Sequence, residues 1–351
     1  MKLFAILLPI IVGILSVVLF KEHILETASA LYNSLIIFTS NSSSAAMTDS
    51  SSPQAQPPAA ANASVPRAIR KAFLAVEQAE GAGARVRRSI GTPQLKNFSP
   101  FLMLDHFSVK PGAGFPDHPH RGQETITYML SGAFDHEDFA GNKGTIHAGD
   151  LQFMTAGRGI VHSEMPAQNA DGSANTGLQL WVDLPRELKS CEPRYRDLRA
   201  AEVPSAASDD GRVAVKVISG RSHGVDSVKD LAYTPVWLLD VTVRPGGRVE
   251  QPVPEGFNAF VYTLEGTALF GAEKRPVPQY HNVVFELEGD AIVAENGEGS
   301  EGDARFVIVA GQVLDQPVVQ YGPFVVTSLD EVREALEDYS THSRGRQVTI
   351  V

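Results

Sequence analysis

The chain has 351 residues, which is long for a single domain, so two domains are the first expectation. Its net charge of −11 disfavours direct binding to nucleic acid, and its single cysteine, Cys191, excludes an intrachain disulfide and a cysteine-based zinc site. The 30 glycines and 22 prolines, without helical periodicity over most of the chain, favour β structure with many turns.

Residues 1–66 are expected to precede the folded part. Residues 3–20 are an uncharged apolar run at the lower limit of a membrane span, which predicts a membrane anchor or a signal sequence cleaved after Ala30. A Ser/Ala/Pro-rich tract at 40–64 is typical of a disordered linker. Translation from Met47 would place the protein in the cytoplasm or nucleus. Translation from residue 1 would place it at a membrane or in the secretory pathway.

The chain contains an internal repeat. Residues 117–132, DHPHRGQETITYMLSG, align without a gap to residues 251–266, QPVPEGFNAFVYTLEG. Gly122 coincides with Gly256 and Tyr128 with Tyr262, and residues 149–159 align to 289–299 after one gap. We therefore predict an all-β fold of two similar barrels or jelly rolls packed together, at residues 67–200 and 213–345.

Residues 124–130 show the alternation of a β-strand. The even positions Glu124, Ile126, Tyr128 and Leu130 form the more hydrophobic face, and the second copy repeats the pattern. We expect this even face to point inward, together with the residues just before it.

One helix is predicted, at the C-terminal end of the second copy. Ser328 followed by Glu331 is typical of a capping box. We expect the helix to pack on a barrel through a stripe formed by Leu329, Val332, Leu336 and Tyr339.

Two pairs of metal-ligand residues share one spacing. His118 and His120 flank Pro119, which restricts the backbone, and in an extended segment both side chains lie on one face. His162 and Glu164 form the second pair. A lone histidine is most often a hydrogen-bonded core or surface residue, but two such pairs on neighbouring strands can supply four ligands to Fe, Zn, Cu or Ni. Such a set leaves room for water or substrate, which favours a catalytic or redox site.

The second copy lacks these residues. Its alignment places Pro252 and Pro254 at the positions of the two histidines that flank Pro119, and Gly302 and Ala304 at the positions of the second pair. The barrel fold therefore does not require the four side chains, which supports a functional interpretation of them in the first copy.

Several long motifs resemble the pirin family, bicupin proteins of the cupin superfamily. They are FPDHPHRGQETITYML (115–130), HEDF (136–139), GDLQFMTAGRGIVHSEMP (149–166), LQLWVDLP (178–185), YGPFVV (321–326) and EVREALEDY (331–339). The resemblance covers residues 68–345 and implies two cupin barrels with a short C-terminal helix. It also implies one non-haem Fe(II), or another divalent transition metal, in the first barrel only. The ligands that it implies are His118, His120, His162 and Glu164.

The wider cupin pattern G-x5-H-x-H-x3-E is met by Gly112, His118, His120 and Glu124. In that pattern Glu124 would be a ligand. In the pirin pattern Glu164 is the ligand, which leaves Glu124 as a neighbour of the metal ligands or as a base.

The resemblance implies an activity like that of quercetin 2,3-dioxygenase, in which O₂ opens a flavonol ring with loss of carbon monoxide. Glu164 or Glu124 would take the proton of the flavonol hydroxyl. The side chains expected to line the substrate site are Phe115, Phe153, Met154, Gln179 and Trp181.

Two other functions stay open. The resemblance also implies a nuclear co-regulator that binds a transcription factor, with the oxidation state of iron as the switch, and the acidic surface suits protein contacts better than DNA contacts. A cupin that acts on a different small molecule is the third hypothesis. A monomer is expected in each case.

Overall fold

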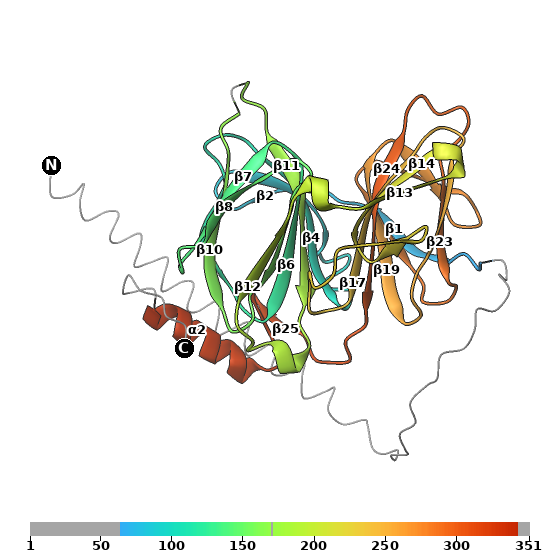
Figure 1. The fold of residues 1–351 in the computed structure, drawn as a ribbon. Helices are drawn as coiled ribbons and strands as arrows, with labels where there is room; N and C mark the ends of the chain where they lie inside the picture. Colours follow the sequence, from blue (N-terminus) through green and yellow to red (C-terminus); the bar gives the residue numbers. More distant parts are fainter. Residues whose placement is uncertain (1–63, 170, 343–351) are drawn as a thin grey trace, which may run out of the picture. The chain divides into compact units, whose positions relative to one another are not determined.

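The computed structural model describes residues 64–169 and 171–342 (Figure 1). The predicted anchor and the linker before residue 64 lie outside these residues. Among the described residues, no helix has the length and apolar character needed to cross a membrane.

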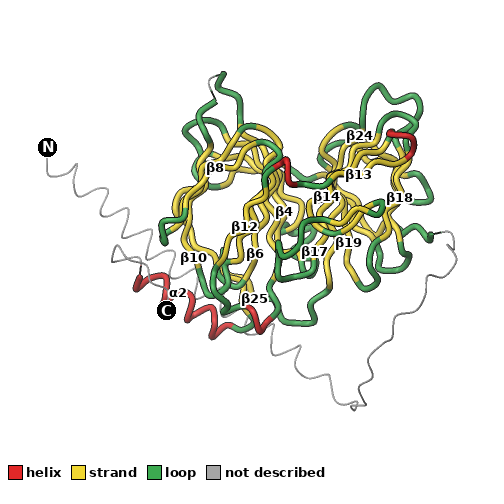
Figure 2. The backbone as a smooth tube through the Cα atoms, in the orientation of Figure 1, coloured by secondary structure: helices red, strands yellow, loops and turns green. Residues whose placement is uncertain are grey.

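The described residues form two β-barrels that lie side by side (Figure 1), and strands make up most of both (Figure 2). In each barrel a seven-stranded antiparallel sheet faces a four-stranded one. The predicted all-β fold of two barrels with one C-terminal helix is confirmed.

In the N-terminal barrel the larger sheet has the order β12 (Arg194–Leu198), β9 (Leu151–Thr155), β6 (Gln123–Ser131), β11 (Asn175–Asp183), β4 (Phe101–Val109), β3 (Ala84–Ile90), β2 (Glu77–Glu80). The smaller sheet has the order β5 (Phe115–His120), β10 (Ile160–Pro166), β7 (Ala133–Asp138), β8 (Lys143–His147).

The C-terminal barrel repeats this plan. Its larger sheet has the order β1 (Ile69–Leu74), β22 (His281–Phe285), β19 (Phe257–Glu265), β24 (Ala304–Gln312), β17 (Val236–Val243), β14 (Val213–Ser219), β13 (Ser205–Ser208). Its smaller sheet has the order β18 (Arg248–Pro252), β23 (Ala291–Glu295), β20 (Thr267–Phe270), β21 (Arg275–Pro278). The remaining elements are the hairpins β15 (Arg221–Ser222) with β16 (Val225–Asp226) and β25 (Val319–Tyr321) with β26 (Phe324–Val326), three 3₁₀ turns, η1 (Arg186–Leu188), η2 (Ala200–Glu202) and η3 (Asp209–Gly211), and α2 (Leu329–His342).

The two seven-stranded sheets pack face to face and bury an apolar layer between the barrels. Phe101 of β4 and Phe260 of β19 meet edge to face in this layer, with ring centroids 5.0 Å apart. Burial of each such side chain contributes about 1.5–3 kcal/mol. Both faces of these sheets are consequently buried, one in the barrel interior and one in the interface between the barrels.

This packing corrects the expected orientation of β6. Its even positions are buried, Leu130 only in part, but Ile126 and Tyr128 face the other barrel. The odd positions face the interior of their own barrel, where Met129 joins an apolar cluster and Thr127 bonds Glu164. Hydrophobicity identified the more apolar face, but that face serves the interface between the barrels.

The interface carries a pair of hydrogen bonds related by the repeat. Tyr128 donates its hydroxyl proton to Asp240 Oδ2 over 2.7 Å, and Arg305 also binds this carboxylate through two nitrogens. In the equivalent contact, the Tyr262 hydroxyl lies 3.2 Å from Nδ1 of His106. The pseudo-symmetric partners of the two tyrosines thus differ in charge.

Both ends of the described chain attach to the barrel that is distant in sequence. β1 pairs with β22 of the C-terminal barrel, although it lies within the predicted range 67–200. The C-terminal hairpin binds the N-terminal barrel through backbone hydrogen bonds between Arg121 and both Pro323 and Val325. Gly122, whose φ is +76°, is required here because a Cβ at this position would overlap the carbonyl oxygen of Val325.

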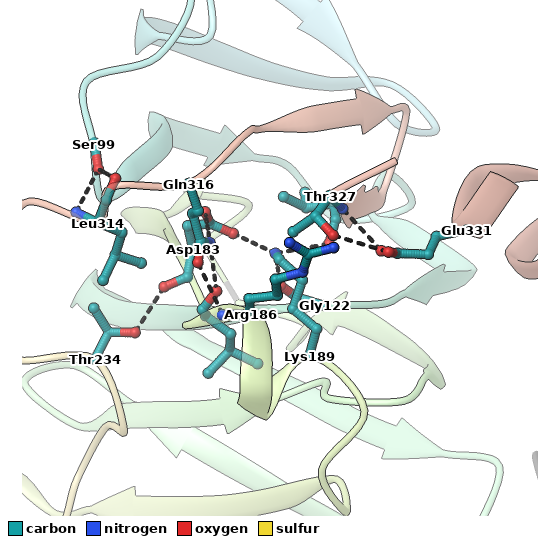
Figure 3. A network of polar contacts seen from close by, with 12 residues as sticks. Ser99, Gly122, Asp183, Arg186, Lys189, Thr234, Leu314, Gln316, Thr327 and Glu331 are labelled. Carbon is teal, nitrogen blue, oxygen red and sulfur yellow. Dashed lines mark hydrogen bonds and ion pairs between the residues drawn. The ribbon is translucent and has the colours of Figure 1, made fainter. Parts of the chain in front are cut away.

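A buried lysine fixes this attachment (Figure 3). Lys189 Nζ donates to Asp183 Oδ1 over 2.6 Å, to the carbonyl oxygen of Gly122 over 2.9 Å and to that of Val325 over 3.0 Å. Gln316, which follows the last strand of the second barrel, donates to the other oxygen of Asp183 over 2.7 Å. One ion pair therefore holds the end of β11, the start of β6 and the C-terminal hairpin together.

Helix α2 begins as predicted, but the predicted stripe is partly wrong. The Glu331 amide donates to Ser328 Oγ over 3.2 Å, and the Glu331 carboxylate accepts from Thr327. Val332 and Ala335 are buried, whereas Leu329, Leu336 and Tyr339 are 46%, 38% and 38% exposed. The helix packs on the β25–β26 hairpin, and the ring of Tyr339 still lies 6.2 Å from that of Phe324 in β26.

We expect acid to destabilise the metal-free protein in part through His106. Burial, together with Arg87 and Arg305, lowers the pKa of His106 to about 4, so between pH 6.5 and 4 the unfolded chain binds a proton that the folded chain does not. As the pH is lowered through this window, His106 should decrease the free energy of unfolding by at most about 1.4 kcal/mol per pH unit. Denaturant titrations at several pH values should show that the free energy of unfolding decreases less steeply on acidification for His106→Gln than for wild type. For exposed His147→Gln the decrease should equal that of wild type. Parallel curves for His106→Gln and wild type would contradict the assignment.

The two interface tyrosines should differ in their contribution to stability. Tyr128→Phe removes a hydrogen bond to a carboxylate and should cost about 1–3 kcal/mol, while Tyr262→Phe removes a bond to a neutral imidazole and should cost about 1 kcal/mol or less. Each variant is the control for the other, and equal losses of unfolding free energy would count against the charged partner as the cause.

Candidate metal site

Three imidazoles converge inside the N-terminal barrel. β5 and β10 are antiparallel neighbours, and His118 pairs directly with His162, while His120 lies two residues along β5. The ring centroids are 4.5–5.0 Å apart, and one nitrogen from each ring lies within 4.8 Å of the others. The two-residue spacing along β5 and the pairing of β5 with β10 therefore bring the three histidines to one point.

The hydrogen bonds of these rings leave nitrogens available at the centre. His118 Nδ1 donates to the carbonyl oxygen of Pro116 over 2.9 Å, so its Nε2 carries a lone pair. His120 Nδ1 lies 2.9 Å from the side-chain amide of Gln123. His120 Nε2 and both ring nitrogens of His162 are buried with no hydrogen-bond partner among the described residues.

Burial also keeps two of the rings neutral. It lowers the pKa of His162 to about 4, although the Glu164 carboxylate opposes the shift. Burial, together with His162 and His118, holds the pKa of His120 well below its usual value. Both imidazoles are therefore unprotonated near pH 7, which is the form that binds metals.

Glu164 lies beside the three histidines but is bonded elsewhere. Its carboxylate accepts from Gln179 Nε2 over 3.1 Å and from Thr127 Oγ1 over 3.2 Å. Thr127 Oγ1 also lies 2.8 Å from Gln179 Oε1, so the three side chains form a closed polar group. Among the described residues, the cluster of converging ligand atoms contains the three histidines and not Glu164.

The residues present fit a divalent transition metal. Buried polar atoms are normally hydrogen-bonded, and leaving one unpaired costs about 1–3 kcal/mol. A metal ion at the centre would satisfy the orphan nitrogen of His120 and one of the two orphan nitrogens of His162, and imidazole suits Fe, Ni, Cu and Zn. Hydrogen bonds at Nδ1 of His118 and His120 would orient these rings towards the ion.

A cavity of about 790 Å³ opens on the site, a size typical of small-molecule pockets. Phe107, Phe115, Phe134 and Trp181 give it aromatic walls. Trp181 packs edge to face against His120, and its Nε1 has no partner among the described residues. The cavity therefore offers flat apolar surfaces with single polar groups.

The structure brings together some of the predicted substrate residues and separates others. Phe115, Gln179 and Trp181 line the cavity. Phe153 is buried between the barrels, and Met154 packs against Ala156 and Ile160, so neither lines it. Both lie on β9, whose side chains alternate between two buried faces.

Glu124 also points away from the cavity. It occupies the even face of β6, and its carboxylate accepts from the backbone amides of Tyr233 and Thr234 and from Thr155 Oγ1. Burial raises its pKa, and these hydrogen bonds oppose the shift. The geometry fits a carboxylate that links the two barrels better than a base.

Two residues at the site were not predicted. Gln123 contacts His120, and Thr127 holds Glu164 with Gln179. Placing odd positions of β6 in the barrel interior would have indicated both.

Comparison with known proteins agrees with the two-barrel fold. The family model described as Pirin matches residues 83–182, and that described as Pirin C-terminal cupin domain matches residues 238–345. Both lie in the range where the motifs resemble pirins.

Individual relatives match over most of their length. A pirin-like protein of Solanum lycopersicum is 49% identical over 280 residues, covering 80% of this chain and 94% of that protein. Pirin of Homo sapiens is 43% identical over 280 residues, covering 79% and 93%. The crystal structure of quercetin 2,3-dioxygenase from Acinetobacter baumannii is similar with a TM-score of 0.73 at 28% identity, covering 80% of this chain and 99% of that one. The chain belongs to the pirin family, with a pirin domain followed by a pirin C-terminal cupin domain.

Proposed function

We propose that the protein is a metal-dependent dioxygenase that uses O₂ to open a flavonol ring, with Fe(II) held by His118, His120, His162 and Glu164. The observation that carries the proposal is that the neutral, buried imidazoles of His120 and His162 have unpartnered nitrogens and converge with His118 at a largely apolar cavity. The similarity to quercetin 2,3-dioxygenase from Acinetobacter baumannii supports the substrate class.

Each group of the chain has a distinct role in this proposal. A bound metal ion would supply the Lewis acidity that favours an ionised flavonol hydroxyl and the redox chemistry that O₂ requires. Glu164 accepts the hydroxyl proton, and Thr127 and Gln179 hold its carboxylate in place. Phe115 and Trp181 position the flat ring and exclude water.

Other metals and the regulatory function stay predictions. The donor set suits several divalent ions. No contact of the described residues identifies a transcription factor surface, so the co-regulator hypothesis is tested only by redox-dependent binding to a partner.

Loss of one ligand should weaken metal binding. His118→Ala removes a nitrogen whose ring is already oriented by Pro116, and we expect at least about a tenfold loss of Fe(II) affinity. Glu164→Ala should also lower the bound iron after dialysis, measured by elemental analysis. Pro254→Ala, at the position of the second barrel that aligns with His120, is the control. Equal iron loss from Pro254→Ala would refute a single site in the first barrel.

Catalysis is tested with anaerobically reconstituted protein. On admission of O₂, the Fe(II) form should consume quercetin and O₂ in equal amounts and release one carbon monoxide per ring opened. Glu164→Gln should lower kcat by about 10²–10⁴-fold, the usual contribution of a positioned base. Absence of turnover with Fe, Mn, Ni, Co and Cu alike would reject the flavonol activity.

A further inference from the structure

A row of polar side chains crosses the larger sheet of the N-terminal barrel. Neighbouring strands β9, β6, β11, β4 and β3 place Gln152, Thr127, Gln179, Asp105 and Arg88 directly opposite one another. Side chains at such paired positions lie on the same face of a sheet. Gln179, Asp105 and Arg88 line the cavity, so the row runs along one of its walls.

The second barrel has the same row without the polarity. The repeat aligns Thr127 with Val261, and strand pairing continues from it through Ile308, Leu239 and Val217. All three lie in the apolar interior of the second barrel. The second barrel therefore forms with apolar side chains at these positions. The barrel fold does not require the polar side chains found there in the first barrel.

The far end of the row is a fixed cation between two carboxylates. Arg88 Nε and Nη2 donate to the two oxygens of Asp105 over 2.9 and 2.7 Å, and Nη2 also donates to Glu80 over 2.6 Å. Asp105 is buried, and the Arg88 side chain is 19% exposed. Arg88 and Asp105 both line the cavity, so a guanidinium group lies beside carboxylate oxygens at this end of the wall.

We propose that Asp105 and Arg88 select substrates by binding hydroxyl groups on a ring distant from the reacting centre. The inference rests on the proposed flavonol activity. Arg88 lies two strands from Gln179, about 10 Å along the wall, so a multi-ring aromatic can reach from Gln179 to Arg88. The carboxylate oxygens accept from a ring hydroxyl, and the guanidinium group donates to one.

The charges favour a neutral polyhydroxylated ring over an anionic one. Glu80 and Asp105 together carry two negative charges against the single positive charge of Arg88. An anionic group would be repelled by these carboxylates, whereas a hydroxyl can donate and accept at once.

The test compares two flavonols that differ in hydroxylation. Quercetin and 3-hydroxyflavone share the reacting hydroxyl, but 3-hydroxyflavone lacks the others. Anaerobic titration of the Fe(II)-loaded full chain should show wild type binding quercetin at least about tenfold more tightly, as expected for hydrogen bonds to charged groups.

The matched variant replaces Arg88 and Asp105 with the residue types found at the corresponding positions of the second barrel, Val217 and Leu239. Arg88→Val with Asp105→Leu removes both charges together, so no unpaired charge stays buried. We expect an unchanged iron content, an unchanged Kd for 3-hydroxyflavone and loss of the preference for quercetin. If this double variant does not fold, Asp105→Asn, which keeps the shape of the side chain, should reduce the preference severalfold.

Each outcome bears on the inference. Equal binding of the two flavonols by wild type, or a preference that survives the substitutions, overturns it while the proposed activity stands. Tighter binding of a flavonol with a carboxylate in place of the distant hydroxyls would also overturn it, in favour of an anion site. If wild type binds neither compound, the proposed activity fails and the inference fails with it.

Discussion

The burial of both faces of the two large sheets governs the rest of the structure. In each barrel one face of the seven-stranded sheet must be apolar to pack on its partner, and Tyr128, Phe260 and Tyr262 are committed to that role. The other face closes only its own barrel. This second face is free to differ between the copies, and the candidate metal site of the described residues lies on it or opposite it.

The difference between the interface face and the interior face of each large sheet explains which site residues could be predicted from the sequence. The spacing of His118 and His120 was sufficient to place these two on one face, because two-residue periodicity is a local property of extended chain, whereas His162 joins them through the pairing of β10 with β5. The comparison with prolines in the second copy showed that the fold does not need them. These arguments used only positions along single strands and the repeat.

Orientation across the sheet could not be predicted in the same way. When both faces of a strand are buried, hydrophobicity does not distinguish the barrel interior from the interface between barrels. Glu124 and Phe153 were therefore placed at the site although they face the other barrel, while Thr127, one residue from a predicted face, was overlooked. The pairing of strands, which decides these positions, is a long-range property.

The exchange of chain ends has a consequence for how the molecule is made. Arg67 binds carbonyl oxygens of Pro254 and Phe257, so the C-terminal barrel is completed by some of the first described residues. The N-terminal barrel in turn receives Val325 from the last hairpin. Contacts this distant in sequence form late in folding, since long loops must close first. During synthesis the N-terminal barrel, whose strands lie within residues 77–198, lacks its contact with the β25–β26 hairpin until nearly the whole chain has left the ribosome. A fragment cut between the barrels would expose the unpaired edge of β22.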